Sequence, residues 1–340
     1  MDVPGLFDPW RAERVEFSNR IVVSPMCQYM ADEAGHTTDW HLVHYGSLAL
    51  GGAGLVMVEA TAVEARGRIS PRDVGLFSDS HVPGLRRIVD FAHGHGARIG
   101  IQLAHAGRKA DLPDEIVAPS AVRFSDDYQM PRALAPDDLE AVAAAFAAAA
   151  RRAVAAGFDL VEVHAAHGYL LHEFLSPLSN VRPDEYGGTA ARRASFPLRV
   201  IGAVRAAVAG RIPVGMRISA SEYRDDGFTL AEAADFCRRA ADGGIAFVDV
   251  SSGGNVPAAS PAYPGYQVPL AEAVKKSAGV PVIAVGMLDD PHLAEFVVAS
   301  GKADAVAVAR GFLRDKHWAH RAAIALGRTP QPPAPYRRAY

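Results

Sequence analysis

The sequence predicts an α/β protein that folds as a single (β/α)8 TIM barrel. Eight apolar runs each precede a helical pattern, and the two kinds of segment alternate strictly along the 340 residues. The apolar runs are nearly continuous, as in parallel strands that are buried on both faces. A doubly wound sheet is the alternative, but it would need a Gly-x-Gly-x-x-Gly turn after an early strand, and the sequence has none.

The strands and helices can be placed in order along the chain. The strands are expected at residues 20–25, 54–60, 98–103, from 160 onward, and at 214–219, 247–252, 282–286 and 305–310. The helices are expected at 40–50, 81–92, 137–156, 196–208, 230–241, 269–277, 291–300 and 317–326. The alanine-rich helix is the clearest, because Ala is the best helix former; Asp137 is expected to cap it and Gly157 to end it.

Two loops and the C-terminus depart from the regular alternation. A long polar excursion, 105–136, follows the third strand, and another loop follows the fourth. We interpret residues 1–340 as one barrel domain in which 329–340 form a C-terminal arm. Its Pro332–Pro335 stretch favours a stiff extended chain, although a disordered terminus is an equal alternative.

Composition excludes several classes of protein. The formal charge, 35 − 38 = −3, implies no general attraction for nucleic acid or an anionic membrane. Two distant cysteines, Cys27 and Cys237, argue against a disulfide framework, a zinc ribbon or a cysteine-bound cluster. No apolar run reaches the roughly 18 residues of a membrane span, and no signal peptide is recognisable. We therefore expect a soluble cytoplasmic protein.

A polar cluster follows the fourth strand. His164, His167 and Tyr169 fall within six positions. Two neutral imidazoles can donate hydrogen bonds to one oxygen, which stabilises negative charge developing there, and a nearby phenol can supply a proton. A His-x-x-His pair is also compatible with a metal site or with packed core histidines. No carboxylate or cysteine at ligand spacing lies close by, although other strands could supply ligands.

The C-terminal ends of barrel strands form the active site in this fold, so the residues there can be collected. Besides the cluster after strand four, they include Ser24, Pro25, Met26, Cys27, Tyr29, Ala60, Gln102, Arg217, Gly286, Ala309 and Arg310. This set has few carboxylates and no Ser/His/Asp arrangement, which disfavours acid–base hydrolysis. It suits a flat, anionic, hydrogen-bonding cofactor.

Three features of the set favour a phosphate-bearing flavin. Gly286 and Arg310 follow the strands where barrels commonly hold a phosphate, although glycines also close ordinary turns. Arg217 would be costly in a barrel mouth without an anionic partner, and Gln102 offers both a donor and an acceptor to a ring edge. Cys27 has a plain alternative role as a buried thiol.

Several ordered motifs resemble the Old Yellow Enzyme family of FMN-dependent ene-reductases, in particular its bacterial, thermostable-like subgroup. The motifs lie at residues 24–29, 102–109, 164–170, 174–177, 184–188 and 263–266, and the resemblance runs nearly end to end. It implies non-covalent FMN, NADPH as the reductant and an activated alkene as the substrate. It also implies a homodimer or homotetramer.

The resemblance also implies a role for each matching residue. His164 and His167 would bind the substrate oxygen, Tyr169 would donate the proton and Cys27 would tune the flavin. Tyr29 and, from a neighbouring subunit, Arg338 would contribute to the substrate pocket. FMN would contact the residues at the remaining strand ends, which are Ser24, Pro25, Met26, Cys27, Ala60, Gln102, Arg217, Gly286, Ala309 and Arg310. Ala309 departs from the glycine usual before the phosphate arginine.

Other functions stay open at this point. A metal-dependent barrel hydrolase would use His164 and His167 as ligands. Another FMN barrel reductase is the second alternative: a 2,4-dienoyl-CoA reductase would need more domains and more cysteines, and a dihydrouridine synthase would need a basic face for tRNA.

Overall fold

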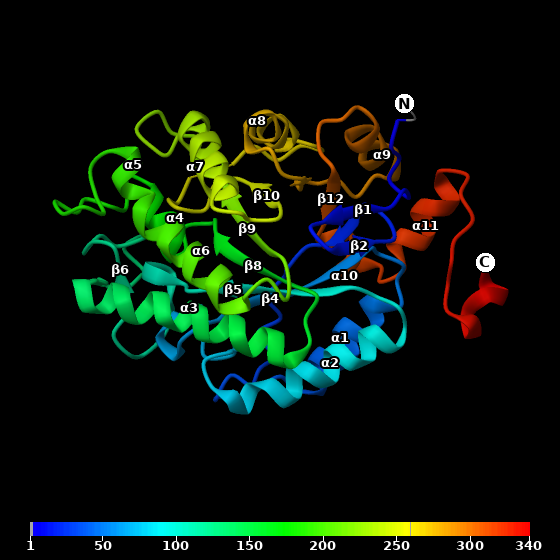
Figure 1. The fold of residues 1–340 in the computed structure, drawn as a ribbon, viewed down its shortest axis with the longest axis horizontal. Helices are drawn as coiled ribbons and strands as arrows, with labels where there is room; N and C mark the ends of the chain where they lie inside the picture. The colour runs from blue at the N-terminus through cyan, green and yellow to red at the C-terminus, as the bar shows by residue number, and fades with distance from the viewer. Residues whose placement is uncertain (1–2, 259) are drawn as a thin grey trace.

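The computed structural model describes residues 3–258 and 260–340, and these form a closed barrel of eight parallel strands (Figure 1). The strands in chain order are β3 (Ile21–Val23), β4 (Leu55–Ala62), β5 (Ile99–Ala104), β8 (Leu160–Ala165), β9 (Val214–Ser219), β10 (Val248–Ser251), β11 (Val282–Ala284) and β12 (Ala305–Val308). Each strand pairs in parallel with the next, and β12 closes the barrel against β3. The predicted fold class is confirmed.

The eight predicted helices are also present. They are α1 (Asp39–Ala49), α2 (Val82–Gly94), α3 (Pro136–Ala156), α6 (Ser195–Val208), α7 (Leu230–Asp242), α8 (Val268–Ala278), α9 (Pro291–Ala299) and α11 (Trp318–Ala325). Their bounds differ from the expected ones by at most two residues, and the predicted cap of α3 was wrong. Helix α3 begins at Pro136, so Ala135 rather than Asp137 is its N-cap residue, and the Asp138 Oδ2 atom accepts the Ala135 N–H at 2.9 Å.

A short hairpin that the sequence pattern did not predict closes the N-terminal end of the barrel. Strands β1 (Trp10–Ala12) and β2 (Val15–Phe17) pair in antiparallel fashion. The rings of Trp10 and Phe17 stack with centroids 4.6 Å apart and join the cluster inside the barrel that contains Met57 and Phe247. Three-residue strands are too short to show a period, so only their contacts with the barrel identify them.

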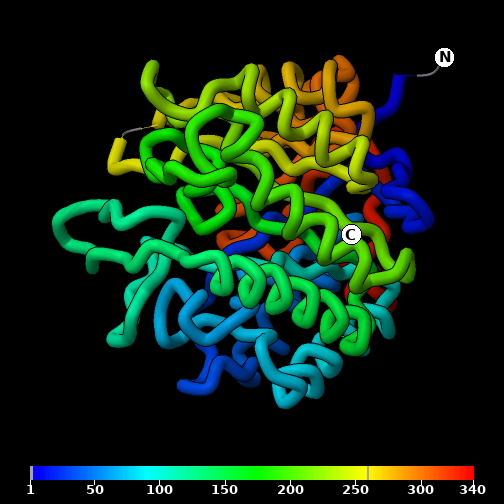
Figure 2. The backbone as a smooth tube through the Cα atoms, turned by 60° about the vertical axis from the view of Figure 1, so that its left-hand side comes forward, coloured from blue at the N-terminus to red at the C-terminus, as the bar shows by residue number. Residues whose placement is uncertain are grey.

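The loops hold further short elements. They are β6 (Val117–Ala118) and β7 (Arg132–Ala133), the helices α4 (Leu170–Leu175), α5 (Ala190–Arg193) and α10 (Arg310–Arg314), and the 3-10 turns η1 (Ala65–Gly67), η2 (Asp79–His81), η3 (Gly107–Lys109) and η4 (Ala334–Ala339). The excursion after β5 therefore contains a two-residue ladder, and it extends outward from the barrel in Figure 2. The last strand ends at Val308, two residues earlier than expected, and Arg310 starts α10.

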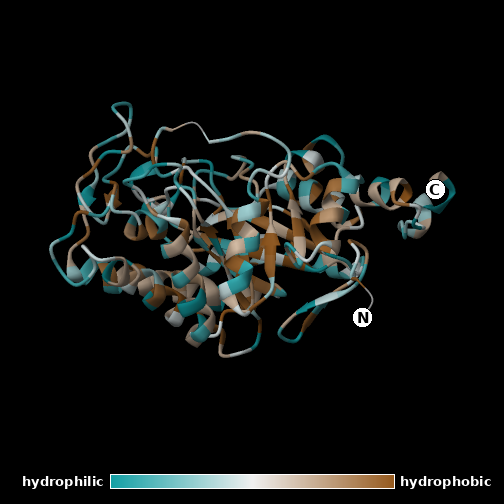
Figure 3. Cartoon of the chain, turned by 90° about the horizontal axis from the view of Figure 1, so that it is seen from above, coloured by the Kyte–Doolittle hydropathy of each residue, from teal (hydrophilic) through white to brown (hydrophobic). Residues whose placement is uncertain are grey.

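The apolar core lies between the strands and the helices and continues inside the N-terminal part of the barrel. Figure 3 shows the hydrophobic strands at the centre and hydrophilic residues on the outer loops. Inside the barrel, Gly215 makes room for Phe247, because a Cβ atom at position 215 would lie 2.2 Å from the Phe247 ring. Because the N-terminal part of the barrel is tightly packed, we expect the functional site at the opposite, C-terminal end of the strands.

Candidate active site

Neighbouring barrel strands bring the predicted site residues together at their C-terminal ends. Gln102 on β5 pairs in register with Glu162 on β8, and His164 on β8 pairs with Arg217 on β9. Arg217 pairs in turn with Asp249 on β10. The amide, the imidazole and the guanidinium therefore lie on adjacent strands around one mouth of the barrel.

The two histidines and the tyrosine form one cluster. The ring centroids of His164 and His167 are 5.1 Å apart, and those of His164 and Tyr169 are 5.0 Å apart, both edge to face. A tight turn allows this, since His167 has a φ of +61° and Gly168 has a φ of +71°. A side chain at Gly168 would meet the carbonyl oxygen of Gly254 at 2.2 Å, so the turn requires glycine there.

Both imidazoles are neutral. Burial first, and then the positive charge of Arg217, lower the pKa of His164 and of His167 well below the usual value. A neutral imidazole has one N–H donor, and the hydrogen bond of its other nitrogen decides where that donor lies. The His164 Nδ1 atom accepts the Ala166 N–H at 3.3 Å, so the hydrogen of His164 resides on Nε2.

A chain of hydroxyl groups is compatible with either tautomer of His167. The Ser252 hydroxyl donates to Gln267 Oε1 at 2.5 Å, while the Ser251 Oγ atom lies 2.8 Å from His167 Nε2 and 3.2 Å from Gln267 Oε1. When Ser251 donates to Gln267, the hydrogen of His167 resides on Nε2. When Ser251 donates to His167 Nε2, the hydrogen of His167 resides on Nδ1.

The phenol of Tyr169 lies beside a half-buried lysine. Burial first, and then Cys27, raise the pKa of Tyr169 well above its usual value. The Lys109 Nζ atom donates to the carbonyl oxygens of His167 and Gly254, each at 2.9 Å, and lies 5.2 Å from the Tyr169 ring centroid. Lys109 thereby ties the turn after β8 to the turn after β10 and places a cation beside the phenol.

A layer of charged groups lies inside the barrel next to Gln102 and Arg217. The Gln102 Nε2 group donates to Glu162 Oε1 at 2.7 Å, and Arg217 Nε lies 3.2 Å from Asp249 Oδ2. Burial first, and then Asp249, raise the pKa of Glu162 to about 8; burial also raises the pKa of Asp249. Buried ionisable groups are costly, so a cluster at a strand end is typical of a functional site.

A cavity of about 290 Å³ adjoins this layer, and its lining includes Arg217, Gly286, Ala309 and Arg310. Among the residues that the structure describes, Arg310 has no carboxylate partner, and the Arg217 Nε atom is buried without a hydrogen bond of good geometry. Two guanidinium groups at one small cavity fit an anionic phosphate and a polar ring edge. These residues therefore fit FMN.

The segment after β3 completes the rim. The Ser24 N–H donates to the Val308 carbonyl oxygen at 3.1 Å, which holds the segment against β12. Cys27 is partly buried, and burial first, then Glu59, raise the pKa of its thiol. Tyr29 is 47% exposed and has a φ of +55°.

Two further observations concern other classes of protein. No group of three or more His, Cys, Asp or Glu side chains suited to a metal ion occurs within residues 3–258 and 260–340. In the same part of the chain, no helix combines the length and the apolar character that a membrane crossing requires.

Comparisons with known proteins agree with this geometry. The model of the NADH:flavin oxidoreductase / NADH oxidase family matches residues 5–328. The chain belongs to this family. NADPH dehydrogenases of Geobacillus sp. (strain WCH70) and Listeria innocua are 47% and 45% identical over 336 residues, which are 98% of this chain and 98% and 99% of theirs.

Solved structures of this flavin oxidoreductase family are similar over nearly the whole chain. Morphinone reductase superposes with a TM-score of 0.83 at 28% identity, covering 98% of this chain and 92% of that one. A 2-naphthoyl-CoA reductase gives a TM-score of 0.90 at 25% identity, covering 95% of this chain and 52% of that one. The resemblance to the Old Yellow Enzyme family, the oxidoreductase class, FMN and a nicotinamide reductant are confirmed.

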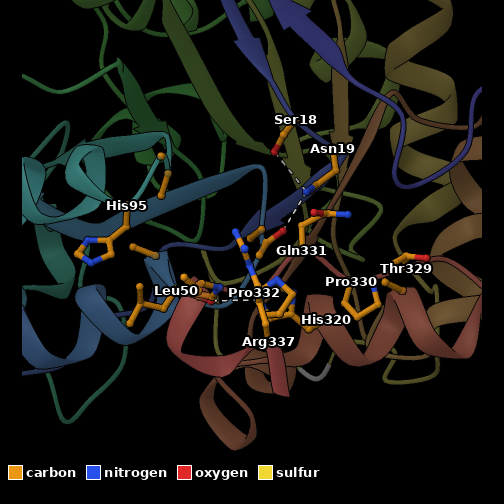
Figure 4. Close-up of a pocket in the computed structure, with 18 of the residues that line it drawn as sticks. Ser18, Asn19, Leu50, His95, His320, Thr329, Pro330, Gln331, Pro332 and Arg337 are labelled. Carbon is orange, nitrogen blue, oxygen red and sulfur yellow. Dashed lines mark hydrogen bonds between the residues drawn. The ribbon is translucent and has the colours of Figure 1, made fainter. Parts of the chain in front are cut away.

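The C-terminal arm of this flavin oxidoreductase lies away from its own site. Arg338 is exposed on η4, which has no buried residue. A cavity of about 880 Å³ separates the arm from the loops that precede β3, β4 and β5 (Figure 4). These loops lie at the end of the barrel opposite the site, so Arg338 does not join the other predicted residues within one chain.

Four residues near the site were not assigned a role from the sequence: Glu59, Lys109, Glu162 and Asp249. Three of them are carboxylates in the middle of apolar strand runs, and the burial of each is nearly complete. A charge inside a buried strand is the signal that could have identified them, because such a charge needs a partner or a function.

Proposed function

We propose that this protein is an NADPH-dependent ene-reductase that reduces the activated C=C bond of α,β-unsaturated carbonyl or nitro compounds. One observation carries the proposal: two neutral imidazoles and a phenol gather at the mouth of the barrel, where Ser251 links His167 to a cavity lined by guanidinium groups. The similar proteins support it, since they include an NADPH dehydrogenase and a morphinone reductase whose structure is known in complex with tetrahydroNAD.

The substrate oxygen would lie between the two imidazoles. The Nε2–H group of His164 and, in the tautomer whose Nε2 accepts from Ser251, the Nδ1–H group of His167 would donate to it, which withdraws electron density from the β-carbon of the alkene. Neither of these nitrogens has a partner within the described residues, and neither is sealed in the interior. Ser251 would act through His167 by holding that tautomer. A bound FMN would supply the hydride chemistry here, with NADPH as the reductant.

Tyr169 would donate its proton to the α-carbon from the face opposite the hydride. Its raised pKa keeps the hydroxyl protonated before the reaction. The ammonium of Lys109 favours the phenolate that forms, and its own pKa, lowered to about 8 chiefly by burial, leaves it mostly charged at neutral pH. The phenol is then reprotonated from solvent.

The residues that would hold FMN surround the cavity and the rim. Arg310, Ala309 and Gly286, which line the cavity, would hold the phosphate, while Gln102 and Arg217 would bind a polar edge of the ring. Ser24, Pro25, Met26, Cys27 and Ala60 would line the ring from the strand ends of β3 and β4. Tyr29 would border the substrate.

The visible absorption spectrum of the purified protein tests the proposal. We expect a flavin spectrum that NADPH bleaches without oxygen, and that a simple enone such as cyclohexenone restores. A phenol titration should shift the flavin band, because phenols occupy the imidazole pair. A colourless protein that contains tightly bound zinc would instead favour a metal-dependent hydrolase.

We further propose that the arm completes the site of a neighbouring subunit in a homodimer or homotetramer. Tyr336, Arg338 and Tyr340 are all exposed, and the arm cannot serve its own site from the opposite end of the barrel. Figure 1 shows it standing off from the barrel beside α11. Truncation before Tyr336 should weaken enone affinity and reduce the oligomer mass in light scattering. Unchanged values in both measurements would refute the role of Arg338.

A further inference from the structure

The turn after β3 adopts a conformation that needs support. Tyr29 has a φ of +55°, a region that residues with a Cβ atom rarely occupy and that costs about 1 kcal/mol or more. Cys27 and Tyr29 flank Gln28, so the position of both side chains depends on the backbone at Gln28. Strain of this kind persists only where surrounding groups hold it.

The side chain of Glu59, on β4, binds the backbone of this turn. The Gln28 N–H donates to Glu59 Oε2 at 2.8 Å. The Tyr45 hydroxyl donates to Glu59 Oε1 at 2.9 Å and accepts the Glu59 N–H at 2.9 Å. Glu59 and Tyr45 are 0% and 1% exposed, so these bonds are shielded from water.

Helix α1 supplies another donor toward the carboxylate. The His41 Nδ1 atom accepts the Thr38 N–H at 3.0 Å, so the hydrogen of His41 resides on Nε2, which lies 3.5 Å from Glu59 Oε1. Burial lowers the pKa of His41 to about 4, so this ring is neutral. Thr38 also donates its hydroxyl to the Met30 carbonyl oxygen at 3.0 Å, which ties the same helix end to the turn.

The charge of Glu59 has no cationic partner in the described part of the chain. Apart from neutral His41 and Tyr45 of α1, Glu59 interacts electrostatically with three ionisable groups, which are Asp73, Cys27 and Tyr29. None of these three carries a positive charge. The pKa of Glu59 is raised to about 7, chiefly by burial. The hydrogen bonds from Gln28 and Tyr45 act in the opposite direction and limit this rise. A buried carboxylate without a cation is costly, so packing alone does not account for it.

We propose that Glu59 is a positioning residue for the reaction: its hydrogen bond to Gln28 holds the Cys27–Tyr29 turn, and its negative charge beside that turn adds to burial in disfavouring the Cys27 thiolate. This inference rests on the proposed function, in which Cys27 borders the flavin and Tyr29 borders the substrate. The hydrogen bond and the charge are separable, because glutamine retains an acceptor for the Gln28 N–H but carries no charge.

Two variants of the holoprotein test the proposal. Glu59→Gln should bind phenol within about twofold of the wild-type Kd. At pH 8.5, where Glu59 is mostly ionised, it should raise the rate of Cys27 alkylation by iodoacetamide at least about threefold, because thiolate is the nucleophile. Glu59→Leu should weaken phenol binding about tenfold or more while FMN stays bound. Cys237 is fully buried on α7 and serves as an internal control that should stay unmodified.

The outcomes are distinct. Wild-type phenol affinity in Glu59→Leu, or an unchanged Cys27 alkylation rate in Glu59→Gln, would overturn the proposal. If Glu59→Leu does not fold, Tyr45→Phe replaces it, and the loss of one bond to the carboxylate should weaken phenol binding about threefold; no change would count against the role. If the wild type binds neither flavin nor phenol, the proposed function fails, and the alkylation comparison alone still decides whether the charge of Glu59 acts on Cys27.

Discussion

Replacing Tyr169 by Phe separates the two half-reactions of the proposed mechanism. The Tyr169 hydroxyl has no hydrogen-bond partner in the described residues, and the ring contacts with His164 and Lys109, at 5.0 and 5.2 Å, remain available to phenylalanine. The ring also packs against the small apolar cluster of the β5 excursion. The free energy of unfolding should therefore change by no more than about 0.5 kcal/mol.

The catalytic effect should be much larger. General acid catalysis contributes roughly 10²- to 10⁴-fold, so losing the proton donor should raise the barrier of alkene reduction by about 3–5 kcal/mol. The hydride transfer from NADPH needs no proton from Tyr169. Anaerobic stopped-flow absorbance at the flavin band measures the two steps separately, first with NADPH and then with an enone.

Tyr128→Phe provides the matched control. Tyr128 is another phenol near the site, and its ring contacts Phe124 edge to face with centroids 5.0 Å apart. It should leave both half-reactions within about twofold of the wild type. An equal loss of both half-reactions in Tyr169→Phe, or reduction of the enone at the wild-type rate, would refute the role of Tyr169 as the acid.

Three further predictions follow from the structure. Arg310→Met should weaken FMN binding about tenfold or more, because it removes a cation from the cavity proposed for the phosphate. Fluorescence titration of the apoprotein measures the affinity. Arg11→Met is the control, because Arg11 is exposed and pairs only with Glu16 among the described residues. Gly168→Ala should lower the free energy of unfolding by more than about 2 kcal/mol, because a Cβ atom would lie 2.2 Å from the Gly254 oxygen at a φ of +71°, and urea unfolding measures the change. His44→Gln should make stability less sensitive to acid. Burial first, and then Lys316, lower the pKa of His44 to about 4, so the unfolded chain binds this proton more tightly. The contribution of His44 to the free energy of unfolding is present above about pH 6.5 and is lost as the pH falls toward 4. It amounts to about 3 kcal/mol, because a pKa difference of one between the folded and unfolded chain corresponds to about 1.36 kcal/mol. Urea unfolding at pH 6.5 and pH 4.5 should show a smaller loss in the variant than in the wild type, and equal losses would contradict the assignment.

The eight strand–helix units could be predicted because each has a local signature. The helix at 136–156 is rich in alanine and ends at Gly157, and its observed bounds differ from the expected ones by one residue. The hairpin of Trp10 and Phe17 and the short helix α10 have no such signature. Their stability comes from contacts with residues far away in the sequence, which no local period reveals.

The sequence by itself determined the fold class and the group of residues at the strand ends, since apolar periodicity defines a parallel barrel and a barrel brings the ends of its strands together. His164, Arg217 and Gln102 could be collected in this way. Only the tertiary structure decided which nitrogen of His164 carries its hydrogen, which carboxylate holds the turn of Cys27, and at which end of the barrel the arm lies. These depend on hydrogen bonds between groups on different elements, such as Glu59 and Gln28, and their geometry exists only once the chain has folded.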